Sequence, residues 1–274
     1  MKVTLICLSF AGASAAVYRQ WGALLPSWIR VHALDLPGHG VKRAQPALHR
    51  WPEVADALER EALRVIDGPF AIFGYSMGAL TGLEMAHRLR RTHGLTPLWF
   101  GAAACAAPAC RTPDATWLDC PDEAMIAELR RLGATPEELL GDRGFLDLAL
   151  PVLRADFHLC ATYVRPDNAL RAPLACPLLA LGGRNDTLSE QSDYLSAWAN
   201  ETSAGFTQRV FDGGHFFIDT ARAELIDAIV TSLASASTCA APANPLAHAG
   251  IPGAAFRTAS IDSAGAAGPR SFHS

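Results

Sequence analysis

One segment constrains this chain more than any other: an apolar stretch that runs into a Gly-x-Ser-x-Gly sequence and then into a second apolar stretch. Phe70–Tyr75 is predicted as a buried strand and Met77–Arg91 as a helix that is apolar on nearly all sides. Ser76 lies at their junction, within Gly74-Tyr75-Ser76-Met77-Gly78. So sharp a turn needs small residues where strand and helix approach each other, and it leaves the serine hydroxyl exposed. We therefore expect a strand–turn–helix unit with Ser76 at its tip.

Short apolar segments alternate with helical segments along the chain, which is typical of a mostly parallel sheet with helices on both faces. Further helices are expected over Pro52–Asp67 and residues 220–235. The expected strands are Val3–Phe10, Ile29–Leu34, Phe70–Tyr75, Leu98–Ala103, Leu178–Gly182 and Gln208–Phe211. A chain of 274 residues is long enough for one domain with a single sizeable core. The predicted class is α/β.

Two segments depart from the alternation. The first, about 108–173, contains no convincing strand, so we expect a helical lid inserted between two core strands. Additional scaffold without a lid function would give the same pattern. Its apolar residues at helical spacing are Met125, Ile126, Leu129 and Leu132. The second, 237–274, is mostly Ala, Gly, Pro and Ser and is expected to be a disordered tail. The folded domain would then span residues 1–236.

A serine hydroxyl becomes a good nucleophile only when a neighbouring base accepts its proton. His215 follows the last expected strand and precedes the last helix, where a loop can bring it over Ser76. Asp186 follows the preceding strand and can fix the tautomer of that histidine, although it could instead cap a following helix. The chain order Ser76, Asp186, His215 is that of the α/β-hydrolase fold, which we therefore predict.

Other residues compete for these roles or complete the site. His39 is the alternative base, but it precedes Ser76 along the chain. Asp212 and Asp219 are near His215 in sequence and are expected to be loop or helix-start residues. An oxyanion needs two preorganised donors. We expect them to be the backbone N–H groups of Met77 and Ala11. Ala11 lies in the loop after the first strand, and a plain tight turn is the alternative explanation for the small residues of that loop.

Composition excludes several classes of function. The net charge is −4, and no basic run lies beside an apolar helix. Neither nucleic acid nor a membrane is therefore expected as a partner. The seven cysteines are odd in number and include no CxxC pair, so neither a disulfide framework, nor a zinc site, nor any other cofactor is predicted. Reduced thiols favour a cytoplasmic location. The apolar run at the N-terminus is interrupted by Ser9 and Gly12 and lacks the length and cleavage site of a signal peptide.

Taken together, these motifs resemble the type II thioesterases that accompany nonribosomal peptide and polyketide synthases. The residues that carry the resemblance are Leu8–Ser14, Tyr18, Trp21, Leu36-Pro37-Gly38, Phe73–Leu80, Glu84-Met85-Ala86, Leu153-Arg154-Ala155-Asp156, Tyr163, Cys176-Pro177 and Gly214–Phe217. The resemblance implies a cytoplasmic, cofactor-free hydrolase that removes acyl groups from the phosphopantetheine arm of an acyl or peptidyl carrier protein. Ala13, Asp35 and His39 depart from the family's usual residues, the last standing where arginine is frequent.

Two other functions fit the same residues. A generic carboxylester or small-amide hydrolase would use the same three side chains on a free small molecule. A non-catalytic binding protein on a hydrolase scaffold is the alternative from another class, but it has no physical need for a serine, an acid and a histidine at these positions. Activity on carrier-bound and on free acyl esters separates the first two.

Overall fold

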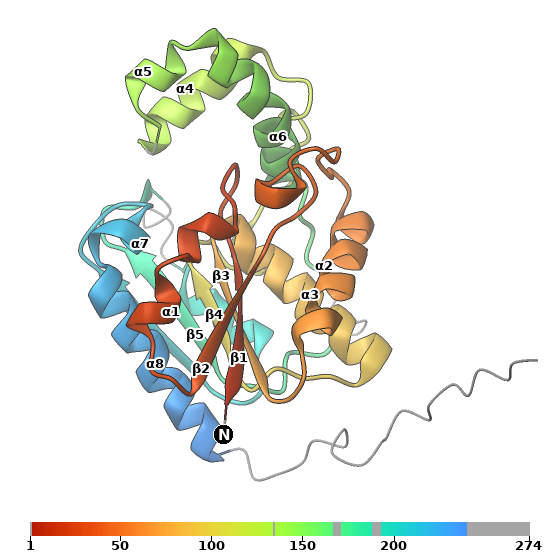
Figure 1. Cartoon of the computed structure of the whole chain (residues 1–274), viewed down its shortest axis with the longest axis vertical. Helices are drawn as coiled ribbons and strands as arrows, with labels where there is room; N and C mark the ends of the chain where they lie inside the picture. Colours follow the sequence, from red (N-terminus) through yellow and green to blue (C-terminus); the bar gives the residue numbers. More distant parts are fainter. Residues whose placement is uncertain (1, 134, 167–170, 188–192, 240–274) are drawn as a thin grey trace, which may run out of the picture. The chain divides into compact units, whose positions relative to one another are not determined.

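A six-stranded parallel sheet forms the centre of the protein in the computed structural model, which describes residues 2–133, 135–166, 171–187 and 193–239. The strand order is β2-β1-β3-β4-β5-β6 (Figure 1). All five neighbouring pairs are parallel, as predicted. The strands are β1 (Val3–Leu8), β2 (Ile29–Leu34), β3 (Phe70–Tyr75), β4 (Phe100–Ala103), β5 (Leu178–Gly183) and β6 (Phe206–Phe211).

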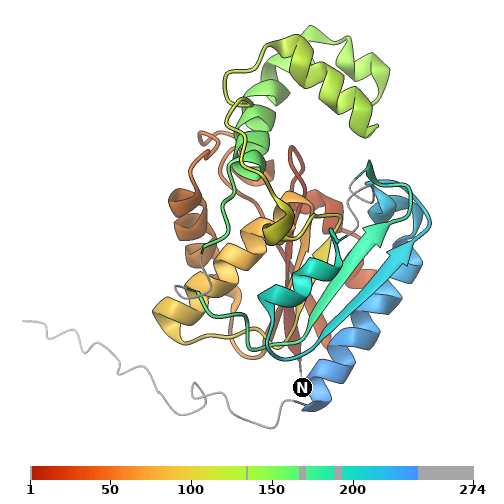
Figure 2. The same ribbon diagram turned by 180° about the vertical axis from the view of Figure 1, so that it is seen from behind.

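Helices cover both faces of this sheet, because successive side chains of each buried strand point to opposite faces. Ile6 and Leu8 of β1 belong to one apolar cluster with α2 (Trp51–Val65) and α3 (Met77–His93). Leu5 and Cys7 belong to a second cluster with α1 (Trp21–Leu24), α7 (Phe217–Thr220) and α8 (Arg222–Cys239). Figures 1 and 2 show the two helical layers from opposite sides. The mostly parallel sheet with helices on both faces that the alternation predicts is therefore present.

The segment between β4 and β5 is helical and lies beyond the carboxyl ends of the strands (Figures 1 and 2). It contains α4 (Asp122–Leu132), α5 (Glu137–Leu140) and α6 (Arg143–Ala161). We call these helices and their connections the helical insertion. Its own apolar cluster contains Met125, Leu129, Leu140, Leu146, Leu150 and Leu153. The four apolar residues that the sequence analysis places at helical spacing are thus divided. Met125 is fully buried in this cluster, whereas Leu132 lines the pocket described below.

The carboxyl end of α6 is anchored to the body of the protein. The last carbonyl groups of a helix have no N–H donor within the helix and need partners from elsewhere. Trp51 Nε1 donates to the carbonyl of Leu159 at 3.1 Å, and Arg111 Nη2 donates to the carbonyl of Cys160 at 2.6 Å. This end of the insertion is therefore held by α2 and by the segment that follows β4.

The last described helix, α8, continues to Cys239, three residues beyond the domain boundary expected at residue 236. The remainder of the expected tail, residues 240–274, lies outside the described residues. Within the part of the chain that the structure describes, no helix is both long and apolar enough to cross a membrane.

Candidate active site

The turn between β3 and α3 has the strained geometry that the sequence predicts. Ser76 adopts φ 53° and ψ −116°, a conformation that is unfavourable for any residue with a side chain. A Cβ on Gly74 would lie 2.1 Å from the carbonyl oxygen of Gly78, and one on Gly78 would lie 2.1 Å from that of Leu8. Both contacts are with backbone, which cannot move aside, so glycine is required at both positions. The strand and helix can then meet closely enough to present the Ser76 hydroxyl.

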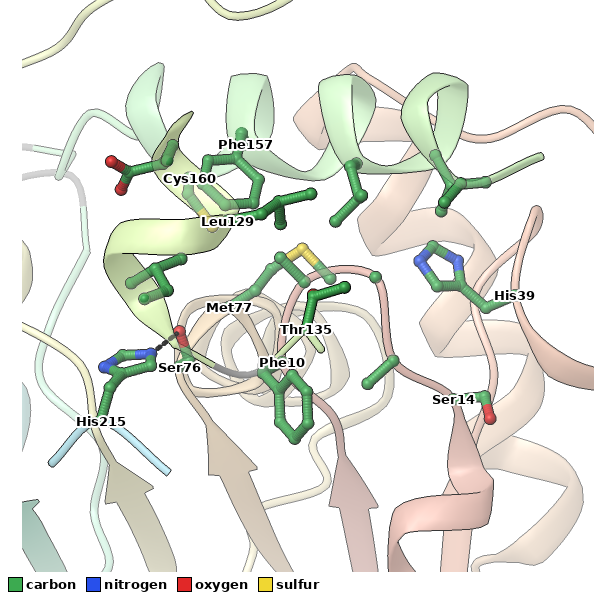
Figure 3. A pocket seen from close by; sticks show the side chains of 18 of the residues that line it. Phe10, Ser14, His39, Ser76, Met77, Leu129, Thr135, Phe157, Cys160 and His215 are labelled. Atoms are coloured by element: carbon green, nitrogen blue, oxygen red, sulfur yellow. Dashed lines mark hydrogen bonds between the residues drawn. The ribbon is translucent and has the colours of Figure 1, made fainter. Parts of the chain in front are cut away.

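Ser76, His215 and Asp186 form one hydrogen-bonded line. The Ser76 Oγ lies 3.1 Å from His215 Nε2 (Figure 3), and His215 Nδ1 lies 2.8 Å from Asp186 Oδ2. The Asp186 carboxylate, which is fully buried, can only accept at this position, so His215 carries its proton on Nδ1. Nε2 is then free to accept the serine proton. The three residues predicted from the sequence are thus brought together from loops that are up to 139 residues apart.

Tyr75 holds the loop that carries the histidine, a role that the sequence analysis missed. Its hydroxyl donates to the carbonyl of His215 at 2.5 Å and accepts from the N–H of Ile218 at 3.2 Å. The side chain is completely buried, and burial raises the pKa of its hydroxyl, which therefore stays protonated. Tyr75 is the second residue of the Gly-x-Ser-x-Gly sequence, but that pattern carries no information about this position.

A pocket of about 650 Å³ lies between the body of the protein and the helical insertion. In Figure 3, Ser76 and His215 lie at one end of the pocket and His39 at the other. The walls from the body include Phe10, Ala11, Met77 and Leu80, and those from the insertion include Leu129, Leu132, Phe145, Leu148, Val152, Leu153 and Phe157. The size and apolar lining suit an aliphatic or aromatic acyl group.

The two predicted oxyanion donors also line this pocket. Met77 is the first residue of α3, so its N–H has no acceptor within the helix. Ala11 is in the turn after β1, and its N–H donates no hydrogen bond to any residue that the structure describes. Two backbone donors are thus available in the pocket that contains Ser76.

The competing residues His39 and Asp212 bond to groups other than Ser76 and His215. His39 lines the pocket but bonds Asp156 and the carbonyl of Pro37, not Ser76. Burial by itself would lower the pKa of His39, but its hydrogen bond to Asp156 and the charge of that carboxylate raise it. Asp212 forms a surface ion pair with Arg184 at 2.8 Å, so it does not reach His215 through the described contacts.

Two cysteines of the pocket are unsuited to nucleophilic chemistry. Burial raises the pKa of the Cys105 thiol to about 11 and that of Cys160 to about 12. Both are therefore neutral thiols near pH 7, whereas the thiolate is the reactive form. Among the described residues, no cluster of His, Cys, Asp and Glu has the arrangement of a metal site.

Comparison with known proteins gives consistent matches over this region. The family model described as Thioesterase domain matches residues 3–233. Gramicidin S biosynthesis protein GrsT of Aneurinibacillus migulanus is 33% identical over 227 residues, which cover 82% of this chain and 87% of GrsT. Thioesterase PikA5 of Streptomyces venezuelae is 33% identical over 79% of this chain and 76% of its own length. The solved structure of the type II thioesterase BorB, from the borrelidin biosynthetic cluster, has a TM-score of 0.75 at 32% identity and covers 85% of this chain and 93% of BorB.

Proposed function

The chain belongs to the thioesterase domain family, and from this premise we propose that Ser76, His215 and Asp186 hydrolyse acyl groups from the phosphopantetheine arm of a carrier protein. That it is a hydrolase of thioesters follows from its family and its relatives. The observation that carries the assignment of residues is the hydrogen-bonded line from Asp186 through His215 to Ser76, at one end of an apolar pocket. The relatives named for gramicidin S and borrelidin biosynthesis support a carrier-bound substrate.

The first half of the reaction forms an acyl-enzyme. Ser76 Oγ attacks the thioester carbonyl carbon while His215 Nε2, 3.1 Å away, accepts its proton. The Asp186 carboxylate stabilises the imidazolium, and the N–H groups of Ala11 and Met77 donate to the oxyanion. Collapse of the tetrahedral intermediate breaks the C–S bond, and the imidazolium proton passes to the departing sulfur, which leaves as a thiol.

The second half returns the enzyme to its starting state. Water attacks the ester carbonyl, His215 accepts its proton, and the same two donors stabilise the second oxyanion. The C–O bond to Ser76 breaks, and the proton held by His215 returns to Oγ. The products are a carboxylic acid and the free serine.

The helical insertion acts as a lid in this proposal. It supplies most of the large apolar side chains of the pocket, including Leu129 and Phe157, and so shields the acyl chain from water. Leu148 lines the pocket and remains 80% exposed, which identifies it as part of the mouth. A pantetheine arm must pass such a mouth to bring its thioester to Ser76.

The test compares three substrates that share one acyl group: a loaded carrier protein, a small thioester and a small oxyester. The expected result is fastest release from the carrier, measured by mass spectrometry. Ser76→Ala should lower turnover by about three to six orders of magnitude. Ser235→Ala, which removes a hydroxyl bonded only within α8, is the matched control and should be unchanged. Retained turnover in Ser76→Ala would refute the assignment, and preference for the oxyester would favour a generic carboxylester hydrolase.

A further inference from the structure

Asp156 connects α6 of the lid to the loop that carries the Ala11 N–H. We call this loop, residues 10–15, the oxyanion loop. The N–H of Gly12 donates to Asp156 Oδ2 at 2.7 Å. One turn earlier on α6, Leu153 packs so closely on Gly12 that a Cβ there would lie 2.6 Å from Leu153 Cδ2. Two residues of the lid helix therefore hold the same glycine, although 144 residues separate Gly12 from Asp156.

The conformation of the oxyanion loop depends on this glycine. The N–H of Ala13 donates to the carbonyl of Phe10 at 3.1 Å and closes a turn that has Ala11 and Gly12 at its centre. Gly12 has φ +75°, as the third residue of a type II turn requires. Because the Gly12 N–H belongs to the peptide that follows Ala11, a hydrogen bond to it fixes the orientation of that peptide. The direction of the Ala11 N–H is set within the same turn.

A charged histidine holds Asp156 in place. His39 Nε2 lies 2.8 Å from Asp156 Oδ2, and His39 Nδ1 lies 3.1 Å from the carbonyl oxygen of Pro37. A carbonyl oxygen and a carboxylate can both only accept, so each ring nitrogen carries a proton and His39 is an imidazolium. The pair is buried, with side-chain exposures of 5% and 1%.

The other end of the loop is held by a second buried carboxylate. Asp35 Oδ1 accepts from the N–H of Ala15 at 2.6 Å, and its Oδ2 accepts from the N–H of Val41 at 3.1 Å. Asp35 belongs to the segment after β2 and not to the lid. Of the two carboxylates, only Asp156 therefore belongs to the lid.

We propose that Asp156 is a positioning residue for the oxyanion hole: its carboxylate, on the anchored end of α6, holds the Gly12 N–H and with it the turn that carries the Ala11 N–H. The inference rests on the proposed function, because it takes Ala11 as an oxyanion donor.

The test measures kcat with a small acyl thioester and, separately, the Kd of the corresponding non-hydrolysable thioether. In Asp156→Ala, kcat should fall about 10- to 100-fold, less than complete loss of an oxyanion donor, because Ala11 is displaced and not removed. The Kd of the thioether should stay within about twofold, since the ground state does not use the hole. In Asp156→Asn, kcat should recover to within about threefold of the unaltered enzyme, because the amide oxygen can still accept from Gly12.

Trp51→Phe is the matched control for general loosening of α6. It removes the hydrogen bond to the Leu159 carbonyl but leaves Asp156 and the oxyanion loop untouched. Its kcat should stay within about twofold of the unaltered enzyme. An equal loss of kcat in this variant and in Asp156→Ala would overturn the proposal, as would an Asp156→Asn variant no better than Asp156→Ala.

Loss of the Asp156 carboxylate leaves the His39 charge buried without its partner, which can impair folding. The double variant His39→Gln with Asp156→Ala removes both charges and should show the same fall in kcat with unchanged thioether Kd. Ser76→Ala is measured in the same assay. If Ser76→Ala is inactive but folded Asp156 variants keep the unaltered kcat, the positioning role alone is wrong; if Ser76→Ala is active, the proposed function itself is wrong.

Discussion

Replacement of Tyr75 by phenylalanine tests how the histidine loop is held. The change removes one hydroxyl and keeps the aromatic ring, which packs against Phe217 with ring centroids 5.2 Å apart. Two backbone groups lose their partner, the carbonyl of His215 and the N–H of Ile218. Each buried group left unsatisfied costs about 1–3 kcal/mol, and the carbonyl can regain part of this from water. We expect the free energy of unfolding to fall by about 2–4 kcal/mol.

Stability and activity should both respond. For a domain of this size the loss corresponds to a decrease in Tm of roughly 5–15 °C. Release of the loop would also move the imidazole, and a displacement of about 1 Å at a catalytic group can cost about 100-fold in rate, so we expect kcat to fall at least about 10-fold. Urea denaturation and steady-state hydrolysis of a small thioester measure the two effects.

Tyr194→Phe is the matched control. The hydroxyl of Tyr194 is buried but has no hydrogen-bond partner among the described residues, so its removal leaves no group unsatisfied. We expect this variant to be as stable as the unaltered protein within about 0.5 kcal/mol, or slightly more stable. If Tyr75→Phe behaved in the same way in both assays, the two hydrogen bonds would not hold the loop and the reasoning would fail.

The remaining predictions concern the acid, pH and the lid. Asp186→Asn should lower kcat by about 10⁴-fold, whereas Asp212→Asn should stay within about twofold; steady-state kinetics that reversed this order would show that the acid is misassigned. Burial lowers the pKa of His87 from 6.5 to about 3, and nearby arginines add to the effect. Between pH 6.5 and about 3, His87 is therefore protonated in the unfolded chain but neutral in the folded protein. The free energy of unfolding should decline as pH falls through this range, by at most about 1.4 kcal/mol per pH unit. Urea denaturation of His87→Gln should show a shallower decline, and an unchanged slope would contradict this. Leu129→Trp should shift hydrolysis towards shorter acyl chains, and a flat chain-length profile would show that Leu129 is ordinary core.

Features that depend on neighbouring residues could be predicted from the sequence. The Gly-x-Ser-x-Gly turn is local, because the two glycines that it needs lie within two residues of Ser76. The strand β3 could be located because burial on both faces leaves an uninterrupted apolar run, and it has the predicted bounds. The strand β2 also has the predicted bounds, although it contains Arg30 and His32 and is only partly buried. His215 and Asp186 could be identified because parallel strands place the loops at their carboxyl ends on one edge of the sheet.

Features that depend on contacts between distant segments were decided only by the tertiary structure. The second residue of the Gly-x-Ser-x-Gly sequence gave no sign that its hydroxyl would hold the His215 loop, 140 residues away. In the sequence, Asp156 is one acid on an amphipathic helix, and only the fold shows that its carboxylate meets the Gly12 N–H. In the same way, His39 is one loop histidine, and only the fold shows that an acceptor lies at each of its ring nitrogens. The physical reason is that a hydrogen bond depends on position and direction in space, which sequence spacing encodes only within a helix, a strand or a turn.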